Sequence, residues 1–164
     1  MTKQKVHKMK RYVIRHGHTG VKRAKRGEFG VEGPPLSELG RQQAAALKQK
    51  LTELGIDPNT EPVAVSELIR THQTADLAGF KNLIVKPVLN EVQTGLPHEE
   101  FIKLFMAEKV APAVLRRAQQ VLDNPPAERV WVMHGLLIIG LRELLGVKAQ
   151  PFDPEFCSIL QLNI

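Results

Sequence analysis

The stretch Arg11-Tyr12-Val13-Ile14-Arg15-His16-Gly17-His18-Thr19-Gly20 sets the organisation of the chain. Its apolar run, Tyr12-Val13-Ile14, has β-branched residues and is too short for a helix, and the glycines that follow indicate the end of a buried strand. In α/β sheets, ligands bind beyond the carboxyl ends of the strands. At that end Arg15 offers a guanidinium suited to phosphate or carboxylate, and His16 offers a proton carrier or nitrogen nucleophile. Gly17 lets the backbone approach a ligand closely. We therefore expect a reactive site where this strand ends.

The length and composition of the chain fit one globular domain. Its 164 residues allow one core of ordinary size, and hydrophobic residues make up 43% and charged residues 24%. We expect residues 1–10 to be a flexible basic N-terminus and residues 11–164 to form a single domain. No window approaches the roughly 18 uninterrupted apolar residues of a membrane-spanning helix, and the N-terminus lacks the apolar core of a secretory signal. The sequence therefore predicts a cytoplasmic protein without a membrane partner.

The chain is basic, with a formal charge of +6 and an isoelectric point near 9.6. Such a charge suits acidic ligands or nucleic acid. Aromatic residues make up only 5%, however, and no cluster of Arg and Lys is interleaved with the stacking residues that single-strand binders use. The one cysteine, Cys157, cannot form an intramolecular disulfide and argues against a cysteine-based zinc site. We expect no nucleic-acid partner.

Short apolar runs alternate with helical patterns along the chain. Strands are expected at 12–14, 62–66, 83–89, 129–133 and 156–162, and helices at 36–55, 67–78, 97–122 and 136–145. Ser37 is expected to cap the first helix, and Pro112 to break the third helical segment into two pieces. A β-α-β-α order favours a largely parallel sheet with helices on both faces. The sequence therefore predicts a three-layer α/β domain.

A loop rich in Gly and Pro follows the first strand at residues 21–35 and carries four cations within five residues, Lys22, Arg23, Lys25 and Arg26. Such a run is usually a solvated face. Alternatively, Lys22 or a neighbouring cation gathers an anionic substrate over His16, because clefts lined by one sign of charge concentrate the opposite sign.

Reactive side chains recur where the expected strands end. Arg15-His16-Gly17 ends the first, Ser66 ends the second with Arg70 one turn into the next helix, Glu91 follows the third, and His134-Gly135 ends the fourth. In a parallel sheet all of them open on the same edge. Two His, two Arg and one Glu suit transfer of a phosphoryl group through histidine. One imidazole attacks phosphorus, the cations and the second imidazole hold the oxygens, and the carboxyl group protonates the leaving oxygen.

In these features the chain resembles the histidine phosphatase superfamily, also known as the phosphoglycerate-mutase-like or Arg-His-Gly family, over nearly its whole length. Each of the similar motifs is common by itself, but their occurrence together in the family order is not. The segments that carry the resemblance are Val13-Ile14-Arg15-His16-Gly17-His18-Thr19, Pro35-Leu36-Ser37-Glu38-Leu39-Gly40-Arg41-Gln42-Gln43-Ala44, Ser66-Glu67-Leu68-Ile69-Arg70-Thr71-His72-Gln73-Thr74-Ala75, Glu91 with Gly95, Val132-Met133-His134-Gly135, and Cys157-Ser158-Ile159-Leu160-Gln161-Leu162.

The resemblance implies a role for each matching residue. His16 would be the nucleophile that passes through phosphohistidine, Glu91 the proton donor, and Arg15, Arg70 and His134 the phosphate pocket. The family uses no metal and no cofactor, which agrees with the lack of a carboxylate cluster in the sequence. From the residues themselves, we add the backbone of Gly17 and the cation of Lys22 to the predicted phosphate-binding set.

Departures from the family pattern bear on the substrate. Position 18, often acidic in the family, is His18, and Lys22 replaces the Asn that phosphoglycerate mutases and many phosphatases carry. Only 42 residues separate Glu91 from His134, which is short for the helical cap of a mutase. We therefore predict a small single-domain, metal-independent phosphatase that hydrolyses a phosphomonoester, or phosphohistidine, on a small molecule or a phosphoprotein.

Four alternatives stay open from the sequence, and one of them, a nucleic-acid-binding protein, rests on charge alone. The chain could be a phosphoglycerate-mutase-type phosphotransferase, or a non-catalytic module that binds a phospho-ligand or a protein. The spacing of His16-Gly17-His18 is also compatible with a metal site that recruits His72 and His98.

Overall fold

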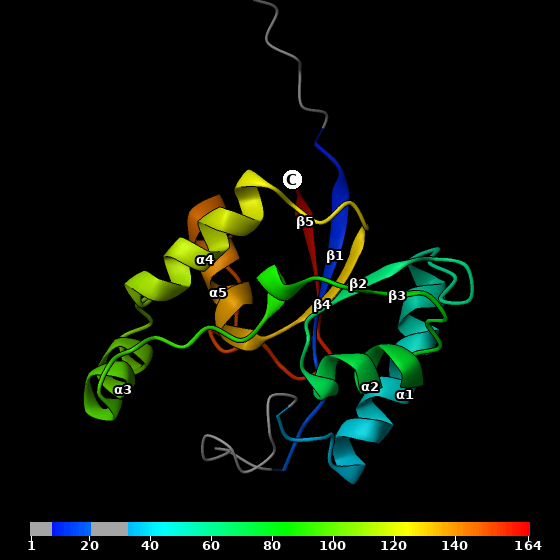
Figure 1. Cartoon of the computed structure of the whole chain (residues 1–164), viewed down its shortest axis with the longest axis horizontal. Helices are drawn as coiled ribbons and strands as arrows, with labels where there is room; N and C mark the ends of the chain where they lie inside the picture. The colour runs from blue at the N-terminus through cyan, green and yellow to red at the C-terminus, as the bar shows by residue number, and fades with distance from the viewer. Residues whose placement is uncertain (1–7, 21–32) are drawn as a thin grey trace, which may run out of the picture.

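The protein is described by a computed structural model, which covers residues 8–20 and 33–164. Within these residues the chain alternates strands and helices (Figure 1). The elements are β1 (Lys10–Arg15), α1 (Glu38–Glu53), β2 (Val63–Val65), α2 (Ile69–Leu77), β3 (Leu83–Val85), the 3₁₀ turn η1 (Pro87–Leu89), α3 (His98–Met106), α4 (Pro112–Asp123), β4 (Val130–Met133), α5 (Gly135–Leu145) and β5 (Ile159–Asn163).

The strands form one mostly parallel sheet in the order β3-β2-β4-β1-β5. Only the pairing of β1 with β5 is antiparallel. The register aligns the strand ends, because Arg15 pairs with Met133 and Val65 with Val132. Consequently the residues that follow β1, β2 and β4 emerge at the same edge of the sheet.

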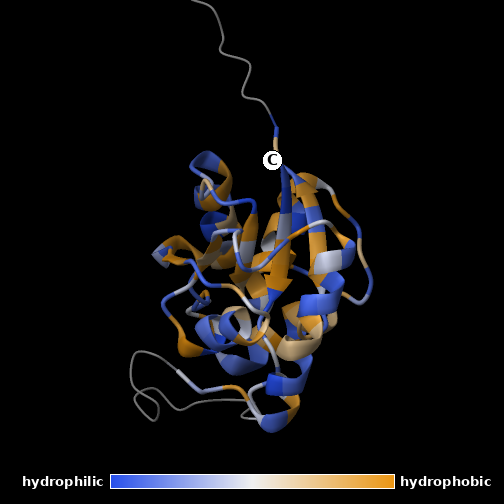
Figure 2. Ribbon diagram, turned by 90° about the vertical axis from the view of Figure 1, so that its right-hand side faces the viewer, coloured by the Kyte–Doolittle hydropathy of each residue, from blue (hydrophilic) through white to orange (hydrophobic). Residues whose placement is uncertain are grey.

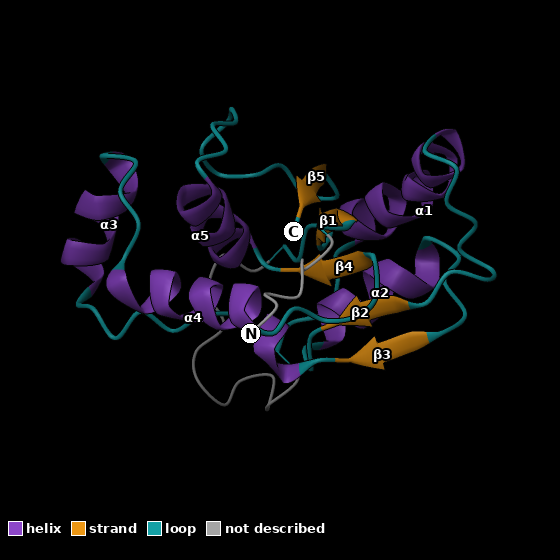
Figure 3. Cartoon of the chain, turned by 90° about the horizontal axis from the view of Figure 1, so that it is seen from above, coloured by secondary structure: helices purple, strands orange, loops and turns teal. Residues whose placement is uncertain are grey.

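Helices cover both faces of the sheet, with α1 and α2 on one side and α4 and α5 on the other (Figure 3). Successive strand residues point to opposite faces. Ile14 accordingly belongs to the core cluster that contains Leu47 of α1, whereas Val13 belongs to the cluster that contains Leu137 of α5. Figure 2 shows the strands as largely hydrophobic ribbons between helices that carry hydrophilic residues. The predicted three-layer α/β architecture is confirmed.

Several element boundaries differ from the predicted ones. The strand predicted at 83–89 ends at Val85, and residues 87–89 form a 3₁₀ turn because Pro87 lacks the N–H that a strand ladder needs. The strand predicted at 156–162 starts at Ile159, since Cys157 has a positive φ of 57° and turns the chain before it. The predicted break near Pro112 separates α3 from α4, and Pro112 is the first residue of α4.

Ser37 caps α1 as predicted, because its side chain accepts a hydrogen bond from the backbone N–H of Gly40. None of the helices in the described part of the chain is long and apolar enough to cross a membrane.

Candidate active site

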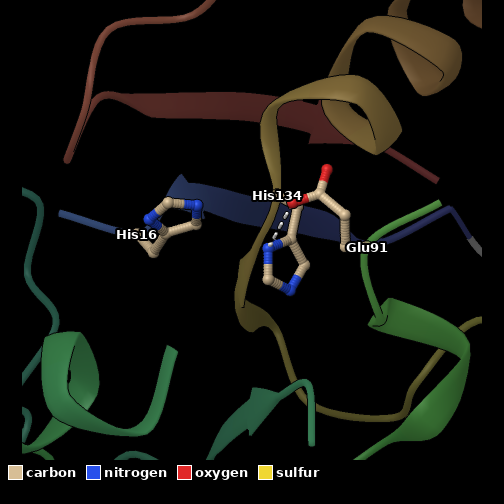
Figure 4. Close-up of side chains that lie close together, drawn as sticks. All are labelled: His16, Glu91 and His134. Carbon is tan, nitrogen blue, oxygen red and sulfur yellow. Dashed lines mark ion pairs between the residues drawn. The ribbon is translucent and has the colours of Figure 1, made fainter. Parts of the chain in front are cut away.

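The carboxyl edge of the sheet brings together side chains from separate parts of the chain. His16 follows β1, His134 lies between β4 and α5, Arg70 is in the first turn of α2, and Glu91 follows η1. The centroids of the two imidazole rings are 5.2 Å apart. Figure 4 shows the side chain of Glu91 beside His134, with His16 on the neighbouring strand end. Parallel register therefore gathers residues that are far apart in the sequence.

The environment of His16 fixes the protonation of its ring. The side chain is buried, and its Nδ1 lies 2.7 Å from the carbonyl oxygen of Gly17. A carbonyl oxygen only accepts, so Nδ1 carries the proton and Nε2 keeps a lone pair. Nε of Arg70 donates to that Nε2 at 3.3 Å. In the geometry of this site, Nε2 is therefore the ring nitrogen with a lone pair available for attack.

Electrostatics keep the His16 ring neutral. Burial lowers the pKa of His16 to about 3, and the positive charges of Arg70 and Arg15 act in the same direction. The hydrogen bond to the Gly17 carbonyl opposes this effect but does not outweigh it. A neutral imidazole has the lone pair that attack on phosphorus requires. The site thus holds His16 as a neutral imidazole at pH 7.

Arg70 joins His16, the predicted nucleophile, to Glu91, the predicted proton donor. Besides its bond to His16, its Nη2 donates to Oε2 of Glu91 at 2.7 Å. Arg70 is buried, whereas the Glu91 side chain is 36% exposed. The Glu91 carboxyl group thus lies beside a fixed positive charge and within reach of solvent. The arrangement can therefore bind an anion at Arg70 and deliver a proton from Glu91.

His134 is fully buried and lies behind Glu91. Its Nε2 is 2.9 Å from the hydroxyl of Ser66, and its Nδ1 is 3.5 Å from Oε2 of Glu91 and has no hydrogen-bond partner. Burial lowers the pKa of His134 well below its usual value, and His16 and Arg70 add to that shift. Ser66 was predicted only as a strand end. The structure gives its hydroxyl a part in orienting His134.

Gly17 is placed by packing between segments. Its N–H donates to the hydroxyl of Thr74 in α2 at 3.0 Å. A Cβ at position 17 would lie 2.7 Å from the carbonyl oxygen of Gly40, and a Cβ at position 40 would lie 2.0 Å from the carbonyl oxygen of His18. The two glycines let α1 approach the reactive loop. The predicted phosphate ligand Lys22, with the rest of the basic loop at 22–26, lies outside the described residues.

Two of the histidines considered for a metal site make other contacts. Nδ1 of His18 lies 2.7 Å from the Ser37 hydroxyl, and Nε2 of His72 lies 2.7 Å from the Ser66 carbonyl oxygen. A hydrogen-bonding carbonyl requires the His72 nitrogen to be protonated, which removes it as a ligand.

A different set, His16, Glu91 and His134, places three ligand atoms within 4.8 Å of one another. Two imidazoles and a carboxylate suit a transition metal. Arg70, however, already donates to Nε2 of His16 and to Oε2 of Glu91. A metal ion at these atoms would therefore have to displace the Arg70 guanidinium, which already supplies positive charge to His16 and Glu91.

Arg15 lies at the side of the site and is held by a loop that sequence reasoning did not single out. Its Nη1 donates to Oδ1 of Asp153 at 3.0 Å and to the carbonyl oxygen of Pro154. The guanidinium carbon lies 4.2 Å from the ring centroid of Phe156. No local motif marks Asp153 or Phe156, because their role depends on where the loop before β5 packs.

Comparison with known proteins places these residues in a family context. The model of the histidine phosphatase superfamily (branch 1) matches residues 11–130, a range that includes His16, Arg70 and Glu91 and stops short of His134. PE-PGRS family protein PE_PGRS11 of Mycobacterium tuberculosis is 39% identical over 88 residues. That match spans 51% of this chain but only 14% of the relative, so the chain covers a small part of that protein's length.

Solved structures share the fold at lower identity. TTHB049 from Thermus thermophilus is 23% identical, with a TM-score of 0.69 over 94% of this chain and 93% of that one. A mutant phosphoserine phosphatase from Entamoeba histolytica in complex with phosphoserine is 21% identical, with a TM-score of 0.65 over 93% and 89%. Mycobacterial glucosyl-3-phosphoglycerate phosphatase Rv2419c, complexed with VO3, is 23% identical, with a TM-score of 0.60 over 93% and 90%.

Proposed function

Because the chain belongs to the histidine phosphatase superfamily, we propose that it is a metal-independent phosphatase that hydrolyses a phosphomonoester through a phosphohistidine on His16. The match to the family model confirms the resemblance from which we predicted a phosphatase. One observation carries the mechanism: a buried, neutral His16 presents the lone pair of Nε2 to the guanidinium of Arg70. A nucleophile beside a fixed positive charge is the arrangement that attack on an anionic phosphoryl group needs.

In the first step, Nε2 of His16 forms a bond to phosphorus while the bond from phosphorus to the leaving oxygen breaks. Nε of Arg70 must release Nε2 for this attack, and a phosphate oxygen is the better acceptor that replaces it. His134 and Arg15 hold further phosphate oxygens. The leaving oxygen takes a proton from Glu91, so that it departs as a neutral hydroxyl group.

Charge balance explains how Glu91 obtains that proton. In the free site each arginine is paired with a carboxylate, Arg70 with Glu91 and Arg15 with Asp153. A phosphate dianion that takes over the N–H groups of Arg70 leaves the Glu91 carboxylate beside added negative charge. A negative charge next to a carboxylate favours its protonated form. We therefore expect substrate binding to bring the proton to Glu91.

In the second step, a water molecule attacks phosphorus and the bond to Nε2 of His16 breaks. The Glu91 carboxylate left by the first step accepts the proton of that water. The products are inorganic phosphate and a regenerated neutral imidazole. Two structural neighbours carry the names of a glucosyl-3-phosphoglycerate phosphatase and a phosphoserine phosphatase, which supports a small phosphomonoester as the first substrate class to screen.

The test is to trap the intermediate. Wild type and His16→Gln are mixed briefly with ³²P-labelled substrates drawn from a panel of phosphorylated metabolites and phosphopeptides, and quenched in base. We expect label on wild type that is stable in base and lost in acid, and none on His16→Gln. Label that survives acid, or that stays on the variant, would refute the phosphohistidine mechanism.

A further inference from the structure

The loop between α5 and β5 reaches the active site through Arg15. Nη1 of Arg15 donates hydrogen bonds to Oδ1 of Asp153 and to the carbonyl oxygen of Pro154. The centroid of the Phe156 ring lies 4.2 Å from Cζ of Arg15. Gly135, the first residue of α5, also lies against it, since a Cβ there would be 3.0 Å from Cζ and Nε of Arg15. The guanidinium is thus confined by an ion pair, an aromatic ring and a residue without a side chain.

The remaining edge of the guanidinium has no protein partner at Nε. This atom is one of three buried side-chain polar atoms without a hydrogen bond among the described residues, and His134 Nδ1 is another. Buried N–H groups are almost always satisfied, so an orphan in an anion site points to a ligand atom. Nε and the adjacent Nη2 of an arginine form the fork that binds two oxygens of a phosphate.

The same aromatic ring also touches the nucleophile. The centroid of the Phe156 ring lies 5.9 Å from that of His16, and it meets His18 edge to face at 5.3 Å. The backbone next to Phe156 is hydrogen-bonded to β1, because the N–H of Cys157 donates to the carbonyl oxygen of Arg15 at 3.0 Å. Cys157 adopts a φ of 57°, which is strained for a residue with a side chain and is held only by its surroundings. The turn directs Phe156 onto the guanidinium.

We propose that Phe156 and Asp153 are positioning residues that aim the Nε edge of Arg15 at the phosphate of the substrate. The inference rests on the proposed function for the identity of the anion. It goes beyond the family resemblance, since both residues lie in a loop outside the matched motifs. Arg142 of α5 supports the loop from behind, because its guanidinium donates to the carbonyl oxygens of Pro151 and Phe152.

Substitution of Asp153 tests the proposal, because a positioning role and a purely electrostatic role predict opposite changes in phosphate affinity. Its side chain is 51% exposed, and an exposed ion pair adds little to stability. If Asp153 were only a nearby negative charge, Asp153→Asn would strengthen phosphate binding by removing repulsion. If it positions Arg15, the same substitution weakens phosphate binding although it makes the site more positive. Asp153→Glu, which keeps the charge and can reach the guanidinium, should recover part of the loss.

The experiment measures inorganic phosphate and vanadate as ligands by calorimetry, and kcat and KM for p-nitrophenyl phosphate. Variants are Asp153→Asn, Asp153→Glu, Phe156→Leu and Phe156→Tyr. We expect Phe156→Leu to raise the phosphate Kd by about 3- to 10-fold through loss of the cation–π contact, and Phe156→Tyr to stay within about twofold of wild type. Asp153→Asn should raise it by about threefold, with an unchanged urea midpoint.

The matched control is Phe101→Leu, which removes a half-buried ring that packs on Phe105. It should leave phosphate binding unaltered. Unchanged or tighter phosphate binding in Asp153→Asn would overturn the proposal, and so would equal losses in Phe156→Leu and Phe101→Leu. Asp153→Asn keeps the proposal testable even if Phe156→Leu does not fold. Calorimetric binding needs no turnover, so wild type that binds phosphate but forms no phosphohistidine would refute the proposed function and leave this inference standing.

Discussion

Lowering the pH from 7 to 5 should barely slow the attack of His16 on substrate. With a pKa of about 3, the ring is about 99% neutral at pH 5, whereas a histidine with the ordinary pKa of about 6.5 would be about 3% neutral. The two cases differ by about 30-fold in the amount of reactive imidazole. The rate of phosphorylation at pH 5 therefore reports directly on the environment that the fold gives to His16.

Arg70 allows this cause to be tested in part. Burial is the largest reason for the lowered pKa of His16, and the positive charge of Arg70 is the next. Arg70→Met removes that charge. The rate should then begin to fall at a higher pH on the acid side of the pH–rate profile (its acid limb), although the midpoint should stay below about 6.5 because burial remains. Arg70→Lys keeps the charge and should leave the limb near its original place. Both variants lose phosphate contacts, so only the position of the limb is compared, not the rate.

The assay is rapid-quench phosphorylation of His16 by p-nitrophenyl phosphate in a single turnover, between about pH 2.5 and 7, so that a limb near about 3 falls within the range. Ratios of variant to wild-type rates at each pH cancel the ionisation of the substrate. A wild-type acid limb with a midpoint near about 6.5 would refute the reasoning about burial. Coincident limbs for Arg70→Met and Arg70→Lys would show that the arginine charge does not act on the ring.

The lowered pKa also has a consequence for folding. The unfolded chain binds a proton at His16 below about pH 6.5, while the folded chain does not until about pH 3, so stability falls as the pH drops through that window. Each histidine kept neutral costs about 1.4 kcal/mol per pH unit, or about 2 kcal/mol at pH 5. His134 is shifted in the same direction. Urea unfolding should accordingly show a steep loss of stability from pH 7 to 5, and His16→Gln should reduce that slope.

Four further outcomes are expected. Glu91→Gln should slow hydrolysis of an alkyl phosphate by about 10²- to 10⁴-fold and that of p-nitrophenyl phosphate far less, because a phenolate leaves without a proton; equal losses would reduce Glu91 to a positioning group. Gly40→Ala should destabilise the fold by about 3 kcal/mol or more in urea unfolding, since its Cβ would stand 2.0 Å from the His18 carbonyl oxygen; a loss below about 1 kcal/mol would contradict this packing. EDTA should leave turnover intact, because Arg70 supplies the charge between His16 and Glu91, while vanadate, which mimics five-coordinate phosphorus, should inhibit.

Some features of the fold could be predicted because they depend on neighbours in the sequence. The apolar run Tyr12-Val13-Ile14 indicates a strand buried on both faces, and Ser37 can cap α1 with atoms three residues away. The strand predicted at 83–89 was too long, since the apolar pattern continues through Pro87 while the hydrogen bonds of the ladder do not.

The residues at the carboxyl ends of the strands can be identified from the sequence, because apolar runs and glycines are local signals. Parallel pairing then brings His16, Arg70, Glu91 and His134 to one edge. The contact of Arg70 with Nε2 of His16, and the pairing of Asp153 with Arg15, come from the packing of distant segments. These features follow from contacts of a few ångströms between segments up to 138 residues apart, and a contact of that kind leaves no periodic pattern in the chain.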